Sequence, residues 1–351
     1  MSSSYERLAA LEVEVEAVEL VGLALEVPGG WTRRTTVVRL VGGGEVGEGE
    51  DVTYQPEDHE ALQAAGPPPG LTDRRTLDAF SRLLDGAALF PRDPADPKAA
   101  VYRRWAFESA ALDLALRQAG RSLAAALGRE ARPLRFVVST GLGDPPSLAP
   151  LEERLWSRYP GLGLKLDATP AWDDALLARL AETGAVHAVD FKGQYKGPFR
   201  GPAPDAELYR RVAEALPHAW LEDPGWTDAT REALAPHMDR VTYDAPICSL
   251  ADLLRVFPAP RAVNLKPSRF GLLSELLRTY ECCQTRGLTV YGGGQFELGP
   301  GRGQIQLLAS LFHPDSANDV APTGFNRAEL PAGLPSSPLP APDAVGFRWG
   351  P

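Results

Sequence analysis

The sequence predicts an α/β protein, a modified (β/α)8 TIM-type barrel preceded by an α+β capping domain. Three observations support this prediction. The N-terminal part alternates apolar and polar residues as strands do, before it changes to helical spacing. The rest of the chain alternates strand-like and helix-like segments, and five successive strand-like segments end on a charged residue. With 351 residues, the chain is long enough for both domains.

The composition is that of a globular protein, with 44% hydrophobic and 23% charged residues. There is no apolar run of about 18 residues or more, so we expect no contact with a membrane, and the acidic beginning does not resemble a secretory signal. A formal net charge of −10 without a basic block argues against nucleic acid as a partner. The three cysteines lack the spacing of a zinc site, and we expect a reduced, cytoplasmic protein that forms a homo-oligomer.

The capping domain is predicted to occupy residues 1–130. Its early segments "LEVEVEAVEL" and "RTTVVRLVGGGEVGEGE" have the pattern of strands around a glycine-rich turn. Two later segments, among them "RTLDAFSRLLDG", have the apolar spacing of helices. We expect the glycine-rich segment "GGGEVGEGEDVTY" to be mobile and to lie over the mouth of the barrel.

The barrel is predicted to occupy residues 131–325. Strands that alternate with helices must be parallel, and about seven or eight such units favour a barrel over an open sheet. Residues 326–351 are rich in proline and are expected to return over the surface as an extended tail. The predicted strands are "LRFVVST", "GLGLKLDA", "AVHAVDFKG", "HAWLEDP", "RVTYDAP", "RAVNLKPS" and "GLTVYGGG".

Five successive predicted strands end on Lys165, Asp190, Glu222, Asp244 and Lys266. The carboxyl ends of barrel strands share one face, so these side chains are expected to converge there. In the alternative interpretation each acid is paired separately with a basic residue, but five charges in register favour one site.

Three converging carboxylates repel each other unless a cation neutralises them. Ligands that are all oxygen suit Mg²⁺, with Mn²⁺ as a second possibility. Such a metal can hold a substrate carboxylate, and a neutral lysine beside it can remove the proton alpha to that carboxylate. The sequence therefore predicts a magnesium enzyme that acts on a small-molecule carboxylate.

These segments resemble the enolase superfamily, and more closely its muconate-lactonizing-enzyme and mandelate-racemase branch. The resemblance extends over nearly the whole chain. It implies that Asp190, Glu222 and Asp244 bind magnesium, that Lys266 is the acid–base lysine of strand six, and that the capping domain selects the substrate. The motifs that carry it are "VDFKG", "WLEDP", "YDAP", "NLKPSRFG" and "GGGQFELGPGRGQIQLLASLF".

The chain departs from the pattern of this branch at two strand ends. Where the branch has Lys-x-Lys, with the second lysine a catalytic base, this chain has Lys165 followed by Asp167. Two positions after Asp190, where an asparagine is usual, it has Lys192. We expect Lys192 to fill part of the space of the missing base and to form an ion pair with Asp167. It would then stay protonated and act as an acid or a clamp; in the alternative it is neutral and acts as a second base.

Three further residues have expected roles. The resemblance places Glu297 near the pocket, where it would polarise the substrate or orient Lys266, although a surface-loop position is an equal alternative. Gly293 lies in a run of glycines that lets the backbone approach a ligand closely, or that simply forms a loop. Asp223 should point away from Glu222 and bind backbone or an arginine.

The expected function is that of a lyase or isomerase that forms an enolate by magnesium-dependent proton abstraction. A cycloisomerase or a dehydratase of the o-succinylbenzoate-synthase kind needs one abstraction, which fits a single strong base. The first alternative is a racemase or epimerase of an acyl amino acid or dipeptide, with Lys192 as the second base. The second alternative is a metal-binding homologue without catalytic activity.

Overall fold

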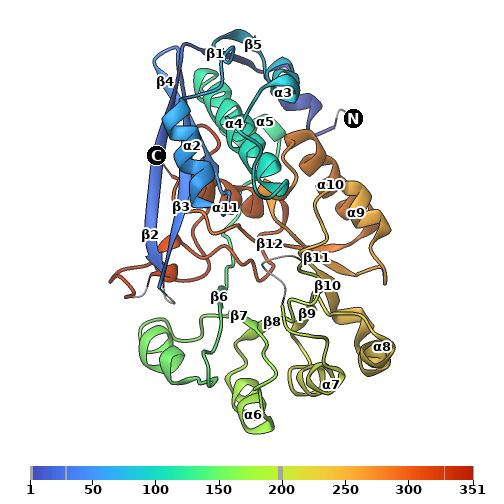
Figure 1. Cartoon of the computed structure of the whole chain (residues 1–351). Helices are drawn as coiled ribbons and strands as arrows, with labels where there is room; N and C mark the ends of the chain where they lie inside the picture. Colours follow the sequence, from blue (N-terminus) through green and yellow to red (C-terminus); the bar gives the residue numbers. More distant parts are fainter. Residues whose placement is uncertain (1–2, 28–29, 197–200, 328, 351) are drawn as a thin grey trace.

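The computed structural model describes residues 3–27, 30–196, 201–327 and 329–350. It has two parts, an N-terminal α+β domain and a curled parallel sheet surrounded by helices (Figure 1). The predicted fold class is confirmed. In the described ranges, no helix has both the length and the apolar character needed to cross a membrane.

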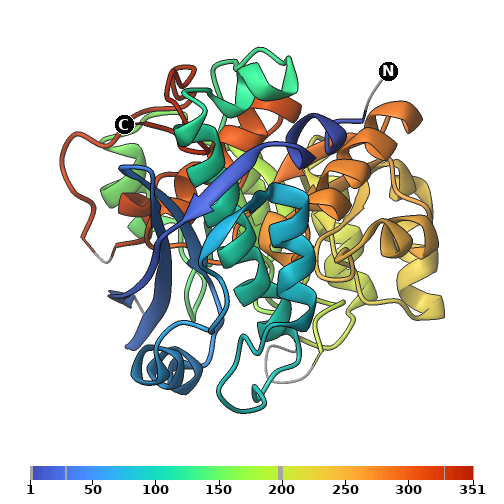
Figure 2. The same cartoon turned by 90° about the horizontal axis from the view of Figure 1, so that it is seen from above.

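The N-terminal domain contains two antiparallel sheets and a helical layer. One sheet has the order β2-β3-β4, and the other pairs β1 with β5. Helices α3 and α4 lie side by side (Figure 2). The elements are α1 (Glu6–Ala9), β1 (Glu12–Val15), β2 (Ala17–Val27), β3 (Trp31–Gly42), β4 (Glu45–Asp51), α2 (Pro56–Ala65), β5 (Asp73–Thr76), α3 (Leu77–Gly86), α4 (Lys98–Gln118) and α5 (Leu123–Leu127).

The glycine-rich segment that we expected to be mobile is instead the buried strand β4, so that expectation is wrong. The reason is close packing of β4 against α4. A Cβ atom added to Gly49 would stand 2.0 Å from the carbonyl oxygen of Ala106, and one added to Gly47 would stand 2.3 Å from that of Ala110. The glycines therefore allow a strand to touch a helix backbone.

Seven parallel strands form the second part, in the order β12-β11-β10-β9-β8-β7-β6. The strands are β6 (Val138–Thr140), β7 (Leu164–Asp167), β8 (Val186–Asp190), β9 (Trp220–Glu222), β10 (Val241–Tyr243), β11 (Ala262–Leu265) and β12 (Thr289–Gly292). The helices are α6 (Asp174–Thr183), α7 (Ala206–Ala215), α8 (Asp228–Leu234), α9 (Leu250–Arg255), α10 (Leu273–Arg286) and α11 (Pro300–Phe312). Shorter turns of helix are η1 (Leu151–Trp156), η3 (Ala235–Arg240), η4 (Pro267–Arg269) and η5 (Thr323–Asn326).

Local sequence signals fix the ends of several of these helices. The side chains of Asp173, Asp205 and Ser249 accept hydrogen bonds from backbone N–H groups in the first turns of α6, α7 and α9. Gly184 and Gly287 end α6 and α10 in the left-handed conformation. These signals set where each crossover begins and ends, and so where each strand begins.

A two-residue segment closes the gap between β12 and β6. Asn318 forms a bridge with Phe136, just before β6, and Asp319 forms one with Gly293, just after β12. The Asn318 amide nitrogen also donates to the carbonyl oxygen of Arg135, at 3.0 Å. This segment takes the place of an eighth strand and brings the Asp319 side chain to the cavity at the barrel mouth.

The C-terminal tail is extended, but it is also anchored. Leu339 pairs with Leu134 at the base of the barrel, and Gly346 pairs with Ser122. Phe347 is fully buried, and its backbone N–H donates to Asp113 of α4 at 2.7 Å. The tail therefore joins the two domains.

We predict that Gly49→Ala lowers the free energy of unfolding by about 1–3 kcal/mol, because β4 or α4 must move to admit the methyl group. Gly86→Ala is the control: it also adds one methyl group, but nothing lies within 4 Å of that site. We expect it to change the stability by less than about 0.5 kcal/mol. Urea unfolding measures both, and equal midpoints would contradict the packing of β4 on α4.

Candidate active site

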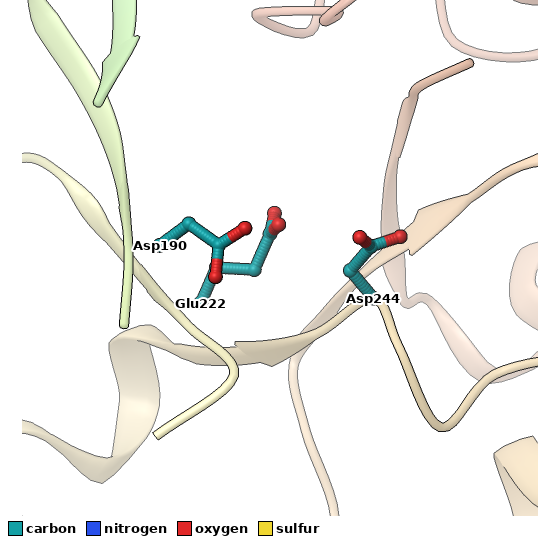
Figure 3. A group of neighbouring side chains, drawn as sticks. All are labelled: Asp190, Glu222 and Asp244. Atoms are coloured by element: carbon teal, nitrogen blue, oxygen red, sulfur yellow. The ribbon is translucent and has the colours of Figure 1, made fainter. Parts of the chain in front are cut away.

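Three acidic side chains meet at the carboxyl ends of neighbouring barrel strands. Asp190 ends β8, Glu222 ends β9, and Asp244 directly follows β10. All three are fully buried, and their carboxylate oxygens lie within 4.8 Å of one another. The three carboxylates point into a common space, with that of Glu222 between the other two (Figure 3). The register that pairs Asp190 with Glu222 accounts for part of this convergence.

Two lysines lie on the β7–β8 side of this group. Lys165, on β7, contacts Glu222 through its Nζ, which is also 3.6 Å from Asp190 Oδ2. Lys192 has a left-handed backbone with φ 55°, and its N–H donates to Asp190 Oδ1 at 2.8 Å. Lys192 Nζ lies 2.7 Å from Asp190 Oδ2 and 3.1 Å from Asp167 Oδ1. The ion pair expected between Lys192 and Asp167 is therefore present, and it also includes Asp190.

A second group of donors surrounds Asp244. Lys266 Nζ lies 2.9 Å from Asp244 Oδ2, and Arg269 Nη1 lies 2.8 Å from Oδ1. The hydroxyl of Tyr195 donates to Oδ2 at 2.7 Å. Asp244 thus has both oxygens occupied by side chains of this protein, and Lys266 stands at the edge of the acidic group.

The buried charges shift one another's pKa values. Burial alone lowers the pKa of Lys165, but the carboxylates of Glu222 and Asp190 outweigh this effect and raise it well above its usual value. Burial raises the pKa of Glu222 to about 7. Burial also disfavours ionised Asp244, but Arg269 and other cations hold its pKa well below the usual range. Burial alone lowers the pKa of Lys192, but the carboxylates of Asp190 and Asp167 raise it well above the usual value.

A cavity of about 860 Å³ opens above these groups. Its barrel side includes Lys165, Asp167, Lys192 and Lys266, and its other side consists of residues of the N-terminal domain. The expectation that this domain covers the barrel mouth is confirmed. The residues that it contributes are Tyr54, Gln55, Ala95, Asp96, Pro97, Lys98 and Tyr102.

Two buried charged side chains fasten the capping domain to the loop after β12. Glu50 accepts hydrogen bonds from backbone N–H groups within residues 298–301. Arg33 donates to backbone carbonyls of residues 52–53 on its own side and 295–296 on the barrel side. Because neither charge is exposed, both connections are shielded from water.

The structure places Glu297 and Gly293 behind the cavity wall, and in the described part of the chain neither lines the cavity. Glu297 accepts the backbone N–H of Gln295 at 2.6 Å and lies 3.1 Å from Arg302. A Cβ atom on Gly293 would stand 2.8 Å from Cε of Lys266, so this glycine makes room for the lysine. These positions do not favour direct substrate contact.

Asp223 behaves as expected. It is not part of the acidic group and accepts the backbone N–H groups of Asp244 and Ala245, at 2.9 and 2.8 Å. Its own φ of 50° is unusual for a residue other than glycine. Asp223 therefore positions Asp244.

Sequence reasoning missed four residues of the site. Arg269 and Tyr195 both line the cavity and contact Asp244. Tyr291, on β12, donates a hydrogen bond from its hydroxyl to Glu222. Asp319 lines the cavity 3.7 Å from Lys165. Only Asp319 had a usable signal, a charged residue after the last helical pattern.

The acidic group suits a divalent metal ion. Its donors are three buried carboxylates with all-oxygen chemistry, which hard cations prefer. The Nδ2 group of Asn264 adds only a weak contact of 3.3 Å to Glu222. In this structure the lysines and Arg269 provide the positive charge that balances the carboxylates, and a divalent ion would add to it.

Two family models match the chain. The N-terminal domain of the domain of unknown function DUF8230 matches residues 6–126, and the C-terminal domain matches residues 130–327, more than half of the chain. An N-succinylamino acid racemase from Amycolatopsis is 29% identical over 260 residues, which cover 70% of this chain and 68% of that protein. The o-succinylbenzoate synthase of Bacillus subtilis is 26% identical over 230 residues, 58% of this chain and 55% of that protein. The match thus spans little more than half of the synthase.

Solved structures match the fold over almost the whole chain. A member of the enolase superfamily from Listeria innocua has a TM-score of 0.70 at 20% identity, over 95% of this chain and 94% of that one. A dipeptide epimerase from Methylococcus capsulatus, complexed with a Mg ion, has a TM-score of 0.68 at 21% identity, over 95% and 99%.

The curated relatives are a racemase and a synthase, and the expectation of an enzyme of the isomerase or lyase type is confirmed at that level. The acidic group and the magnesium-bound structural neighbour agree with a divalent metal site. The fold is that of solved members of the enolase superfamily, which its motifs resemble, and the chain belongs to the DUF8230 family.

Proposed function

We propose that this protein removes the proton alpha to the carboxylate of a small-molecule substrate, with Lys266 as the base. The observation that supports this most directly is the position of Lys266 beside three buried, converging carboxylates under the capping domain. We propose that Asp190, Glu222 and Asp244 hold Mg²⁺, or Mn²⁺ in its place. A divalent cation there supplies positive charge that binds the substrate carboxylate and stabilises the enolate.

The residues of the chain divide the remaining work. Lys266 takes the proton on the lone pair of its amine nitrogen and can return it from the ammonium group so formed, because the residue lines the cavity. Lys165 and Lys192 place fixed positive charge on the opposite side, where the substrate carboxylate would lie. The capping domain excludes water, which strengthens these interactions.

We propose a reaction that needs one proton abstraction, as in a cycloisomerase or a dehydratase similar to o-succinylbenzoate synthase. Opposite Lys266, the strand β7 ends on Asp167. The lysine that contacts Asp167 is Lys192, which the carboxylates of Asp167 and Asp190 hold as an ion pair. A lysine held in this way serves as a clamp or an acid.

The second candidate is a racemase or epimerase of an N-acyl amino acid or dipeptide, with Lys192 as the second base. The observation in its favour is that Lys192 lines the cavity, where it could reach the substrate. A relative with 29% identity is an N-succinylamino acid racemase. The third candidate, a homologue that binds metal without turnover, predicts that no ligand exchanges a proton with solvent.

We predict that Glu222→Gln weakens Mg²⁺ binding about tenfold or more, because it removes the central carboxylate. Asp96→Asn is the control, since Asp96 lies on the cavity wall formed by the capping domain and outside the acidic group. Titration calorimetry measures both variants. The metal assignment fails if Glu222→Gln binds Mg²⁺ as tightly as the unchanged protein.

We predict that Lys266→Ala keeps the fold and Mg²⁺ binding but loses proton transfer by roughly a hundredfold or more. The assay follows the uptake of solvent deuterium alpha to the carboxylate in N-succinyl amino acids and dipeptides, with mass spectrometry as the readout. Circular dichroism and metal titration serve as controls for folding. Undiminished exchange in Lys266→Ala would assign the proton transfer to another group.

We predict that exchange into one enantiomer of an N-succinyl amino acid proceeds without inversion, because only one face of the substrate meets a base. Chiral chromatography of the deuterated product measures this. Lys192→Met should weaken substrate binding yet leave exchange detectable. Full racemisation by the unchanged protein that disappears in Lys192→Met would favour the two-base reaction instead, and a fully active variant would exclude both roles of Lys192.

A further inference from the structure

A buried amide lies between the capping domain and the acidic group. Gln295, in the loop after β12, is only 4% exposed and lines the cavity. Of the two orientations of its side-chain amide, one gives both neighbouring side chains a partner. In that orientation the amide oxygen accepts from Nε and Nη2 of Arg269, at 2.5 and 3.1 Å, and the amide nitrogen donates to the hydroxyl of Tyr54 at 2.9 Å. Gln295 thus joins a residue of the barrel to one of the capping domain.

The guanidinium group of Arg269 has two donor edges, and both are occupied. One edge holds Asp244: Nη1 donates to its backbone oxygen at 2.6 Å and to Oδ1 at 2.8 Å, and Nη2 lies 3.4 Å from Oδ2. The other edge, formed by Nε and Nη2, donates to the amide of Gln295. A planar guanidinium that is held on both edges has little freedom to turn. The position of Gln295 therefore sets the direction from which Arg269 meets Asp244.

The backbone at Gln295 is fixed from both domains. Arg33, a fully buried residue of the capping domain, donates to the Gln295 carbonyl oxygen at 2.9 Å, and its guanidinium carbon lies 4.5 Å from the centre of the Tyr54 ring. On the barrel side, Glu297 accepts the backbone N–H of Gln295 at 2.6 Å. The next residue, Phe296, has a φ of 62°, in the left-handed region that is costly for a bulky side chain. Such strain persists only where the surroundings impose it, so the place of Gln295 is closely specified.

Asp244 stands on one side of the acidic group, and Glu222 lies between it and Asp190 (Figure 3). Asp244 is fully buried, so the direction of its carboxylate is set by its protein partners. Arg269 contacts both oxygens of this carboxylate, and Arg269 is in turn bound by Gln295. A change at Gln295 therefore reaches a proposed metal ligand, although Gln295 itself is not part of the acidic group.

We propose that Gln295 is a positioning residue that connects the seating of the capping domain to the acidic group. The connection runs from Tyr54 through Gln295 and Arg269 to Asp244, and is here called the Gln295 link. With Tyr54 against its amide, Gln295 holds Arg269 in the direction that fixes the Asp244 carboxylate. The proposal rests on the proposed function in one respect, that Asp244 binds the metal. Its consequence is that docking of the capping domain and binding of Mg²⁺ favour each other, because such coupling is reciprocal.

The test is a double-mutant cycle on the affinity for Mg²⁺, measured by titration calorimetry without substrate. Gln295→Met keeps the length of the side chain but removes both of its contacts, and it should weaken Mg²⁺ binding about tenfold. Tyr54→Phe removes the hydroxyl from the Gln295 link and should weaken Mg²⁺ binding roughly threefold. In the Gln295→Met background, Tyr54→Phe should have little further effect on the affinity, because the link is already broken.

Two further variants and a second readout separate the link from general effects. Gln295→Glu keeps an acceptor for Arg269 and for the Tyr54 hydroxyl, so it should retain the Mg²⁺ affinity to within about threefold. Gln55→Met removes another amide from the cavity wall, one that makes no capping hydrogen bond to α2, and it should leave the affinity unchanged. Hydrogen–deuterium exchange of the backbone at residues 241–247 needs no metal, and Tyr54→Phe should speed it about twofold or more.

The outcomes distinguish the Gln295 link from the proposed function. An effect of Tyr54→Phe on Mg²⁺ affinity that disappears in the Gln295→Met background supports the link. Equal effects in the two backgrounds overturn it, as does a Gln295→Glu variant that binds Mg²⁺ as weakly as Gln295→Met. If the unchanged protein binds no Mg²⁺, the proposed metal site fails and the exchange experiment decides the link; it also decides if Gln295→Met does not fold. Faster exchange in Tyr54→Phe then supports the link, and unchanged exchange overturns it.

Discussion

Three buried carboxylates at the ends of adjacent strands are the constraint on which the rest of the structure depends. Placed this close in a medium of low polarity, Asp190, Glu222 and Asp244 cannot all carry charge without positive partners. The fold meets this requirement by bringing a lysine on β7, a lysine directly after β11 and an arginine on η4 to the same place. The same arrangement makes the site able to accept a divalent cation.

Much of the surrounding structure keeps these groups in place. Asp223 holds the backbone at Asp244, Tyr291 supports Glu222 from the barrel interior, and Lys192 holds both oxygens of Asp190. Each acid therefore has a partner that fixes its direction. The partners come from different strands, so the geometry of the site depends on closure of the whole barrel. Closure in turn depends on the short segment at Asn318 that joins β12 to the start of β6.

The sequence was sufficient to predict the parts of the site that lie at regular intervals along the chain. The strand–helix alternation predicted the parallel sheet, and the recurrence of charge at strand ends predicted the acidic group. The strands β3 and β4 around a glycine-rich turn were predicted, but β4 was wrongly expected to be mobile because glycines usually signal loops, whereas Gly49 here allows contact with a helix backbone. Tyr195 and Arg269 were missed because a loop and a short turn bring them to Asp244, and no period in the sequence records such a contact.

The balance of charge in the cavity bears on the substrate. Even with the acidic group counted, lysines and arginines outnumber aspartates and glutamates around the cavity in the ranges that the structure describes. A divalent cation would increase this positive excess. An anionic group must then enter with the substrate to restore neutrality, which favours a carboxylate over a neutral ligand.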